Sequence, residues 1–179
     1  LGNVHNGEWR SSEVGRGEGF YPPSLSFSKD GRFFLLACSD AAGFTHHLKG
    51  KVSELNTRTW SFKRTAHGNR PALAETNSRL IAVHETGISQ LEYVFPEEES
   101  PQAHPFTALD ARLELDTVYS PQFALDGYGV PWLFFIDGTR QHVFYSRWLG
   151  NKWIPILNGF WLKRNSPRFE ENHLSVDYL

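Results

Sequence analysis

The sequence has no methionine, a single cysteine and little excess of either charge. Cys38 lies inside an apolar run, where a thiol acts as a small buried hydrophobe, and one cysteine cannot form a disulfide within the chain. The formal net charge of −2 comes without a basic stripe, so nucleic-acid binding is not expected. No apolar stretch approaches the roughly 18 residues that cross a bilayer, so no membrane span is expected either.

Aromatic residues, in contrast, make up 15% of the 179 positions, which suits β-sheets packed face to face. A proline-led motif also recurs four times at intervals of about fifty residues. The copies are Pro23-Ser24-Leu25-Ser26, Pro71-Ala72-Leu73-Ala74, Pro121-Gln122-Phe123-Ala124 and Pro167-Arg168-Phe169-Glu170. Apolar runs follow them at Phe33–Cys38, Leu80–His84, Trp132–Ile136 and Leu174–Leu179. Short strands repeated at this period predict an all-β protein, and more specifically a β-propeller with one sheet-like blade per repeat.

Each repeat is expected to contain four antiparallel strands, which we call A to D in chain order. Strand A follows the motif proline, and strand B is the apolar run. In the third repeat, strands C and D are expected at His142–Trp148 and Lys152–Ile156. In the first repeat they are expected at Val52–Leu55 and Trp60–Lys63. In the second repeat strand C is expected at Ile88–Phe95, and no Trp marks the start of strand D.

Turn signals and the repeat period together divide the chain into blades. Asp30-Gly31 and Asp126-Gly127 link strands A and B in two repeats, as expected between antiparallel strands. On this layout residues 1–179 form one propeller region, with complete blades at 20–68, 69–118 and 119–164 and partial blades at 1–19 and 165–179. We therefore expect a fragment whose remaining blades lie outside this chain.

Two of the expected C–D turns share a spaced set of residues. Ser146-Arg147-Trp148-Leu149-Gly150-Asn151-Lys152-Trp153 and Ser53-Glu54-Leu55-Asn56-Thr57-Arg58-Thr59-Trp60 resemble the Asp-box, or bacterial neuraminidase repeat, whose pattern is Ser-x-Asp-x-Gly-x-Thr-Trp. Trp148 and Leu55 stand where that family has its Asp. The resemblance implies a propeller of the sialidase-like superfamily in which these turns are structural. We therefore assign Ser53, Trp60, Ser146 and Trp153 to maintaining the fold.

The resemblance implies a class of function. Propellers with these repeats include sialidases, other glycoside hydrolases, polysaccharide lyases, carbohydrate-binding modules and scaffolds without chemistry. It favours a carbohydrate partner and a secreted or periplasmic location. Because one fold hosts all of these functions, the choice among them rests on the site residues.

Acidic residues follow strand B in three repeats. Because strands A and B are antiparallel, the B–C and D–A connections share one face of the predicted ring, opposite the A–B and C–D turns. Asp40, Glu85 and Asp137 are therefore candidate catalytic residues on one face, where carboxylates can transfer protons or accept sugar hydroxyls. The alternative is that each carboxylate caps the turn that follows its strand.

Basic and aromatic residues are expected at the same face. Arg70, just before Pro71, is a candidate to bind the carboxylate of an acidic sugar, and Arg140 lies in a B–C connection. Tyr119 precedes a strand A and is a candidate to stack on a sugar ring. The alternatives are ordinary ion pairs for the arginines and core packing for the tyrosine.

Three histidines complete the candidate site. His46 and His47 are placed in the first B–C connection and His67 in the first D–A connection, where they are candidates for a base or a metal ligand. The alternative is that they are inert surface side chains. No spacing matches a metal motif, so neither a metal nor another cofactor is predicted.

Two functions from different classes remain open on the sequence. The first is a glycan-directed propeller that acts as a glycoside hydrolase or polysaccharide lyase from the B–C and D–A face. The second is a non-catalytic module, either a lectin or a protein-interaction scaffold, that uses the same face. Convergent acids, arginines and histidines favour handling of a polar ligand, whereas the lack of a complete catalytic set favours binding alone.

Overall fold

The computed structural model describes residues 2–5, 8–11, 23–55, 62–76, 79–86, 90–106, 118–137, 142–154 and 159–161. Throughout these ranges the regular structure is β-strand, apart from one turn of 3₁₀-helix, η1, at Val52–Glu54. The prediction of an all-β protein is therefore confirmed. Nothing in this part of the chain forms a helix that could cross a lipid bilayer.

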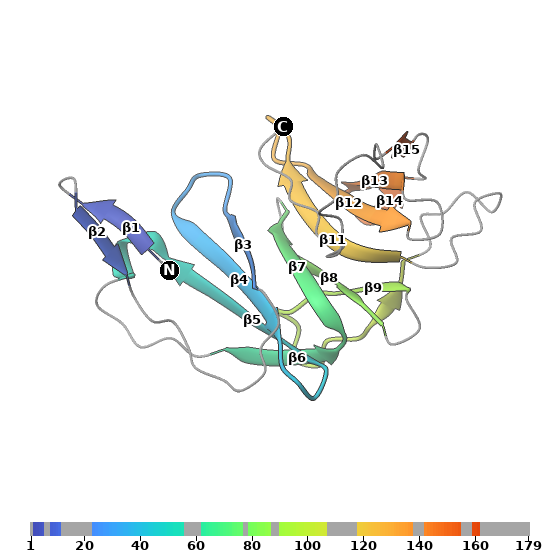
Figure 1. Ribbon diagram of the computed structural model, residues 1–179, viewed down its shortest axis with the longest axis horizontal. Coiled ribbons are helices and arrows are strands. Elements are labelled where there is room, and N and C mark those ends of the chain that lie inside the picture. Colours follow the sequence, from blue (N-terminus) through green and yellow to red (C-terminus); the bar gives the residue numbers. More distant parts are fainter. Residues whose placement is uncertain are drawn as a thin grey trace, which may run out of the picture.

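The strands form three antiparallel sheets that follow one another along the chain (Figure 1). The first sheet has the order β3 (Ser24–Phe27), β4 (Phe33–Ser39), β5 (Phe44–Lys51) and β6 (Lys63–His67). The second has the order β7 (Asn69–Glu75), β8 (Leu80–Glu85), β9 (Leu91–Val94) and β10 (His104–Pro105). The third has the order β11 (Val118–Leu125), β12 (Pro131–Asp137), β13 (His142–Leu149) and β14 (Lys152–Ile154), and β15 (Gly159–Trp161) also pairs with β13. A separate hairpin joins β1 (Gly2–His5) to β2 (Glu8–Ser11).

The expected strands A and B of the three repeats are confirmed, because each motif proline precedes or lies within the first strand of a sheet and each apolar run forms the second. The prediction of strand C in the first repeat is wrong. Val52–Glu54 is the 3₁₀ turn, and the third strand of this sheet is β5, which lies earlier in the chain. Four residues of β5 are buried although its sequence, FTHHLKGK, has little β-propensity. Packing against the second sheet decides this strand, as tertiary context often does.

The A–B turns form as the Asp-Gly signals predict. In the third sheet, the Asp126 carboxylate accepts the backbone N–H groups of Tyr128 and Val130, each at 2.9 Å. Gly129 completes the turn at a φ of +77°, a left-handed conformation that glycine adopts without steric cost. The Asp126 side chain therefore fixes the turn, and this lowers the pKa of its carboxyl against the opposing effect of desolvation.

The second sheet is sandwiched between the other two. Strand β7 packs against β3 and β4 of the first sheet and against β11 of the third, which is visible in the middle of Figure 1. We call the contact between the first and second sheets the first interface and that between the second and third sheets the second interface. The described strands form open sheets and no closed barrel, so the propeller itself stays a prediction.

The residues of the two interfaces differ in size. The first interface is lined by aliphatic residues, namely Leu35, Ala37, Leu73, Leu80, Ala82 and Val94. The second contains a larger cluster in which eight aromatic side chains are buried or packed, namely Tyr93, Phe95, Phe106, Phe123, Phe135, Phe144, Trp148 and Trp153. Trp153 is only 8% exposed and its ring lies 5.1 Å from that of Phe106. The expected burial of Trp153 between sheets is confirmed, whereas Trp60 lies outside the described residues.

Strand pairing shows which positions of the three sheets are equivalent. The residue after the motif proline pairs with Ala37 in the first sheet, Val83 in the second and Phe134 in the third. Counting from these pairs, the position two residues later in strand B is occupied by Ser39, Glu85 and Ile136. Asp40 and Asp137 therefore lie one residue beyond the position of Glu85. The three acids do not occupy equivalent positions.

Candidate functional site

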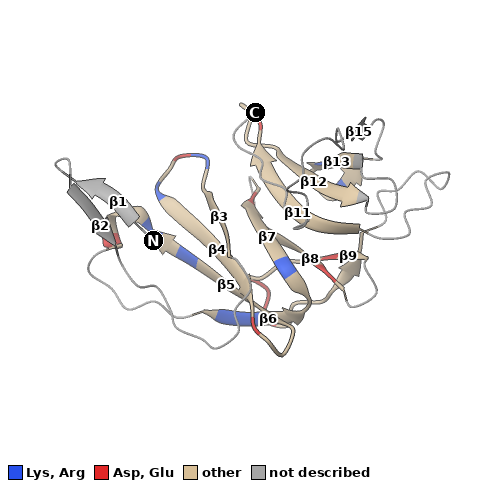
Figure 2. Ribbon diagram, in the orientation of Figure 1, with Lys and Arg blue, Asp and Glu red and all other residues tan. Residues whose placement is uncertain are grey.

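The last residues of the B strands lie next to the first residues of the A strands at one end of the sheets. We call this end an edge, and it corresponds to the face that was predicted to carry the site. Four residues make contact there, and we call them the strand-end cluster: Ser39, Arg70, Glu85 and Ser120. Basic positions lie along β5, β6 and β7, and acidic positions along β8 and β9 (Figure 2). The cluster thus brings together residues of opposite charge from neighbouring strands.

Arg70 is held in an unusual backbone conformation. Its φ is +44°, which is rare for a residue other than glycine and occurs here in the irregular step between Asn69 and Ala72. The Arg70 N–H donates to Ser39 Oγ of the first sheet at 3.3 Å. The side chain is 48% exposed, so the backbone is fixed while the guanidinium reaches solvent.

Glu85 lies beneath this arginine. Its side chain is 11% exposed, and Oε2 lies 3.5 Å from Arg70 Nη1. The other oxygen, Oε1, accepts the backbone N–H of Ser120 from the third sheet at 2.6 Å. Burial raises the pKa of the Glu85 carboxyl, and the Ser120 N–H and the Arg70 charge oppose that rise.

The same contact occurs at both interfaces. Ser120, like Arg70, precedes a motif proline and has a positive φ, of +50°. In each case the residue before the proline donates its N–H to the last residue of strand B in the preceding sheet, which is Ser39 for Arg70 and Glu85 for Ser120. The recurring prolines therefore mark an inter-sheet hydrogen bond as well as a strand, and sequence reasoning missed this role.

Asp40 is used by its own turn. Its Oδ1 accepts the N–H groups of Ala42 and Phe44, each at 3.0 Å, and its Oδ2 lies 2.8 Å from His46 Nε2. The Phe44 N–H, followed by the His46 ring, lowers the pKa of the carboxyl. The alternative interpretation of this acid, as a turn cap, accounts for all of these contacts.

The candidate histidines separate into surface and core residues. His46 pairs with Asp40, and the exposed His67 lies against Phe44 with 3.7 Å between ring centroids. Placing the three histidines in connections was wrong, because His46 and His47 lie within β5 and His67 is the last residue of β6. His47 is 4% exposed. Its Nδ1 bonds to Thr65 Oγ1, whereas its buried Nε2 has no hydrogen-bond partner. Burial, and then the charge of His84, lower the pKa of His47 to about 3.

His84, which was not among the candidate site residues, is a buried histidine close to the predicted site. It is 0% exposed in β8, and neither ring nitrogen has a hydrogen-bond partner. Its Nε2 lies 3.6 Å from Glu92 Oε2. Burial lowers the pKa of His84 to about 4; the backbone of His67 opposes this shift without reaching hydrogen-bond geometry. The sequence signal for His84 was its place at the end of an apolar run.

The remaining candidates are placed only in part. Tyr119 lies in β11 beside Ser120 and is partly buried, which puts it at the same edge as the cluster. Asp137 ends β12 and pairs with Val118, but its side chain lies outside the described residues, as does all of Arg140. Within the described ranges, no three or more His, Cys, Asp or Glu residues are grouped so that they could hold a metal ion.

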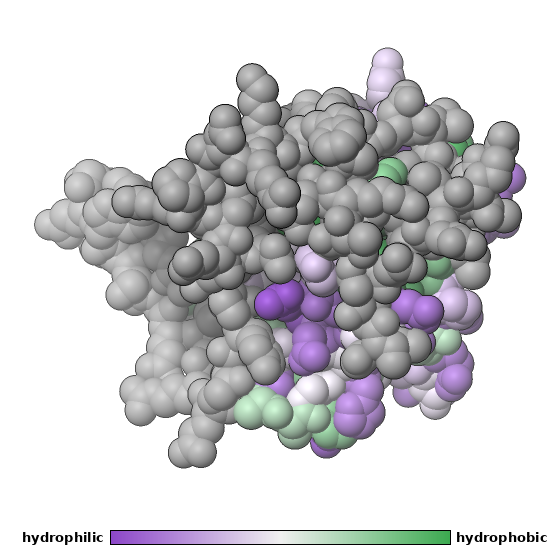
Figure 3. All heavy atoms as spheres, turned by 45° about the vertical axis from the view of Figure 1, so that its right-hand side comes forward, coloured by the Kyte–Doolittle hydropathy of each residue, from purple (hydrophilic) through white to green (hydrophobic). Residues whose placement is uncertain are grey.

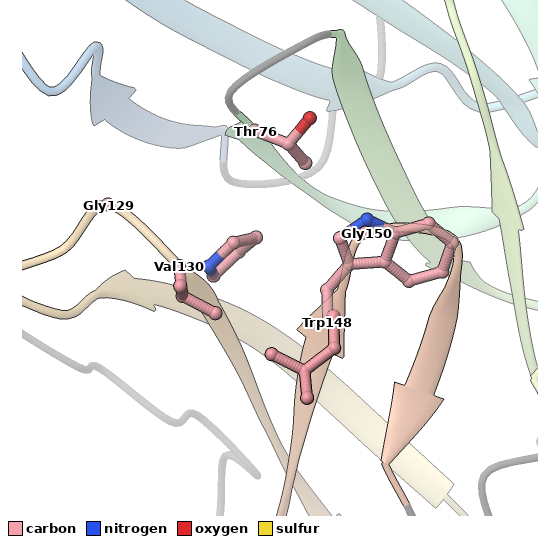
Figure 4. A pocket seen from close by; sticks show the side chains of 7 residues that line it. Thr76, Gly129, Val130, Trp148 and Gly150 are labelled. Atoms are coloured by element: carbon pink, nitrogen blue, oxygen red, sulfur yellow. The ribbon is translucent and has the colours of Figure 1, made fainter.

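A pocket of about 250 Å³ opens at the opposite edge of the sheets (Figure 4). It lies between the A–B turns of the second and third sheets and the C–D turn of the third, and is lined by Thr76, Gly129, Val130, Pro131, Trp148, Leu149 and Gly150. Nearby, the buried Ser146 donates its hydroxyl to the Ile154 carbonyl at 2.5 Å, which agrees with the structural role assigned to this turn. The pocket is separate from the strand-end cluster.

No protein-family model matches this sequence, and no curated protein is similar to it. The Asp-box resemblance therefore stays a prediction.

Proposed function

We propose that this chain is part of a carbohydrate-binding protein of the propeller type, which holds an acidic sugar at the strand-end cluster. The observation that carries the proposal is Arg70, whose backbone is fixed at both ends while its guanidinium is half exposed. Figure 3 shows hydrophilic side chains, with some hydrophobic ones beside them, over the lower part of the face it draws. A polar edge with an anchored arginine suits a polar, anionic ligand.

Arg70 has donors to spare for such a ligand. Of the contacts made by its guanidinium within the described residues, the ion pair of Nη1 with Glu85 is a long one at 3.5 Å. A guanidinium carries five N–H groups in a planar fork, so the outer ones can bind a carboxylate at two points. Because the backbone is already ordered by Ser39 and Pro71, little backbone conformational entropy is lost on binding.

The acids of this edge favour binding over hydrolysis. Glycoside hydrolysis commonly uses two carboxylates on opposite sides of the scissile bond. Of the three candidates, Glu85 lies in the cluster and Asp40 is bound within its own turn, where its pKa is lowered. A proton donor needs the opposite shift. The described residues therefore offer one suitable acid.

A hydrolase or lyase is the second candidate function, and Glu85 is the observation that favours it. Burial raises the pKa of this carboxyl, which suits a general acid at mildly acidic to neutral pH. In that case Arg70 orients the acidic sugar and Glu85 transfers the proton. A scaffold that binds no sugar is the third interpretation. A glycan-binding experiment distinguishes the three.

The test is an array of neutral and acidic glycans probed with the parent, Arg70→Gln and Arg79→Gln. Arg79 is a matched control, because it is 37% exposed and paired with Glu98 near the other edge of the second sheet. We expect Arg70→Gln to lower affinity for acidic glycans by roughly ten- to a hundredfold, the size of a charged hydrogen bond, and Arg79→Gln to leave it unchanged.

Three other results would support a different site or a different function. Binding that survives Arg70→Gln rules out this edge as the site. Glycan turnover that is lost in Glu85→Gln establishes the enzyme, and no response to any glycan favours the scaffold.

A further inference from the structure

The first interface contains two histidines at positions where the second interface has aromatic carbon rings. His84 in strand B is equivalent to Phe135. The residue after the motif proline pairs with Val83 in the second sheet and with Phe134 in the third, and His84 and Phe135 are the next residues along strand B. His47 in strand C pairs with Ala37, as Tyr93 pairs with the equivalent Val83. His47 and His84 thus replace Tyr93 and Phe135 at the same point of the repeat.

The two histidines project into the first interface from opposite sheets. His47 pairs with Ala37, and His84 lies two residues after Ala82; both alanines belong to the aliphatic cluster of this interface. The two rings also interact electrostatically. Together they present three buried ring nitrogens without a hydrogen-bond partner, His47 Nε2 and both nitrogens of His84. Buried polar atoms without partners are uncommon and costly, so a neutral pair is tolerated here and a charged pair is not.

The surroundings offer little compensation for charge. The charged groups near the pair are Glu92 on β9, Lys63 on β6 and His46 beside His47. Glu92 Oε2, at 3.6 Å from His84 Nε2, can pair with one protonated imidazole. Lys63 and His46 add positive charge and make a second proton less favourable. Double protonation therefore places two positive charges, on His47 and His84, in the same buried interface.

The pair lies close to the strand-end cluster. Ser39, which holds the Arg70 N–H, is two residues after Ala37 and pairs with the buried Thr45 in β5, the strand that carries His47. Gly68, two residues before Arg70, is so close to the His84 ring that an added Cβ would come within 2.0 Å of His84 Cδ2. A movement of the His84 ring therefore acts on Gly68, and a movement of His47 acts on the strand pair that holds Ser39.

We propose that acid opens the first interface at this end: protonation of both His47 and His84 separates the first sheet from the second and releases Arg70 from Ser39, while the second interface stays closed. Release of the acidic glycan under these conditions is a consequence that rests on the proposed function. The opening of the interface does not depend on it.

The direct test is hydrogen–deuterium exchange of the whole chain at about pH 7.5 and about pH 4.5, corrected for the intrinsic pH dependence of exchange. We expect the β4 and β5 amides to lose protection by about tenfold or more at the lower pH, and the β12 and β13 amides to keep theirs. Equal losses in both pairs of strands would show general acid unfolding and overturn the proposal.

The matched variant is His47→Tyr with His84→Phe, which copies the residues of the second interface. Its first interface is expected to stay protected at both pH values, whereas His104→Gln, a histidine packed on Tyr93, opens like the parent. Opening that persists in the double variant overturns the proposal.

Should the double variant fail to fold, Glu92→Gln keeps the proposal open to refutation. Removing the carboxylate beside His84 leaves the protonated imidazole without a counter-charge in the closed interface. The opening is therefore expected at a higher pH than in the parent, with no change in β12 and β13. Nuclear magnetic resonance titration of the parent's histidine rings provides the second measurement. The second of the two rings to take up a proton must do so together with the loss of β5 protection; the mechanism is overturned if both rings titrate before that loss or both titrate after it. Loss of glycan binding at neutral pH in Arg70→Gln tests the proposed function separately.

Discussion

The two interfaces of the second sheet place different chemistry at equivalent positions. Toward the third sheet, Tyr93 and Phe135 belong to an aromatic cluster with Trp148 and Trp153. Toward the first sheet, the equivalent residues are His47 and His84, next to small aliphatic residues. The strand-end hydrogen bond also differs, with the neutral Ser39 as acceptor at the histidine interface and the carboxylate of Glu85 at the aromatic interface. One interface contributes stability by burying aromatic area, and the other keeps polar groups close to the candidate site.

The largest expected effect breaks the aromatic interface. Trp153→Ala should lower the free energy of unfolding by about 3–5 kcal/mol, because it removes a buried ring and leaves a cavity among Tyr93, Phe106 and Phe123. Urea denaturation at neutral pH measures the change. Equal stability of the variant and the parent would contradict the structural role of this turn.

The next effect comes from pH and acts on the histidine interface. Burial holds the pKa of His47 near 3 and that of His84 near 4, both below the ordinary 6.5. The unfolded chain therefore takes up protons first as the pH falls below 6.5, so stability that is present above 6.5 is lost as the pH falls toward 4. The loss should be about 1.4 kcal/mol per histidine for each pH unit in this window. Urea denaturation at several pH values measures it.

Its control is the double variant His47→Tyr with His84→Phe. That variant should show a much flatter profile between pH 6.5 and 4, because neither of the new side chains titrates there. A parent profile that is already flat would mean that the pair is solvated, and would remove the contrast between the interfaces.

A steric change sharpens the same comparison. Gly68→Ala should cost about 2–3 kcal/mol, since the new methyl group meets the His84 ring at 2.0 Å and the Glu85 carbonyl oxygen at 2.8 Å. Thermal unfolding measures the loss. Gly127→Ala is the matched control, because nothing lies within 4 Å of a Cβ added there. Similar losses in both variants would show that Gly68 is not packed on His84.

The smallest expected effect concerns the inter-sheet hydrogen bonds. Ser39→Ala should lower stability by about 1 kcal/mol, the usual net value of one hydrogen bond whose partner remains. Chemical denaturation at pH 7 measures it. The exchange rate of the Arg70 amide should rise in this variant while that of the Ser120 amide stays constant. An unchanged Arg70 amide would mean that Ser39 does not hold it.

The sequence predicted the strands whose pattern is local. The motif prolines and the apolar runs gave strands A and B, because burial on both faces leaves a continuous apolar stretch such as Leu80–Glu85. Strand β5 was missed, because its histidines and lysines hide a buried face that exists only against the second sheet. Local pattern carries no information about that partner.

The candidate site was predicted in its location and less well in its members. Arg70 and Glu85 were named from their place at strand ends, and the structure brings them together. Asp40 looked equivalent to Glu85, but strand register separates them by one residue and turns the Asp40 carboxylate to its own backbone. The hydrogen bonds of Ser39 and Ser120 were not predicted, because they depend on irregular strand pairing at Arg70 and Ser120.

The direction of the strand-end hydrogen bonds has a consequence for how the protein is made. In both cases the acceptor belongs to the earlier sheet and the donor to the next one along the chain, as with Ser39 and Arg70. During synthesis, which exposes the N-terminal part first, each finished sheet therefore presents an acceptor before the segment that uses it emerges.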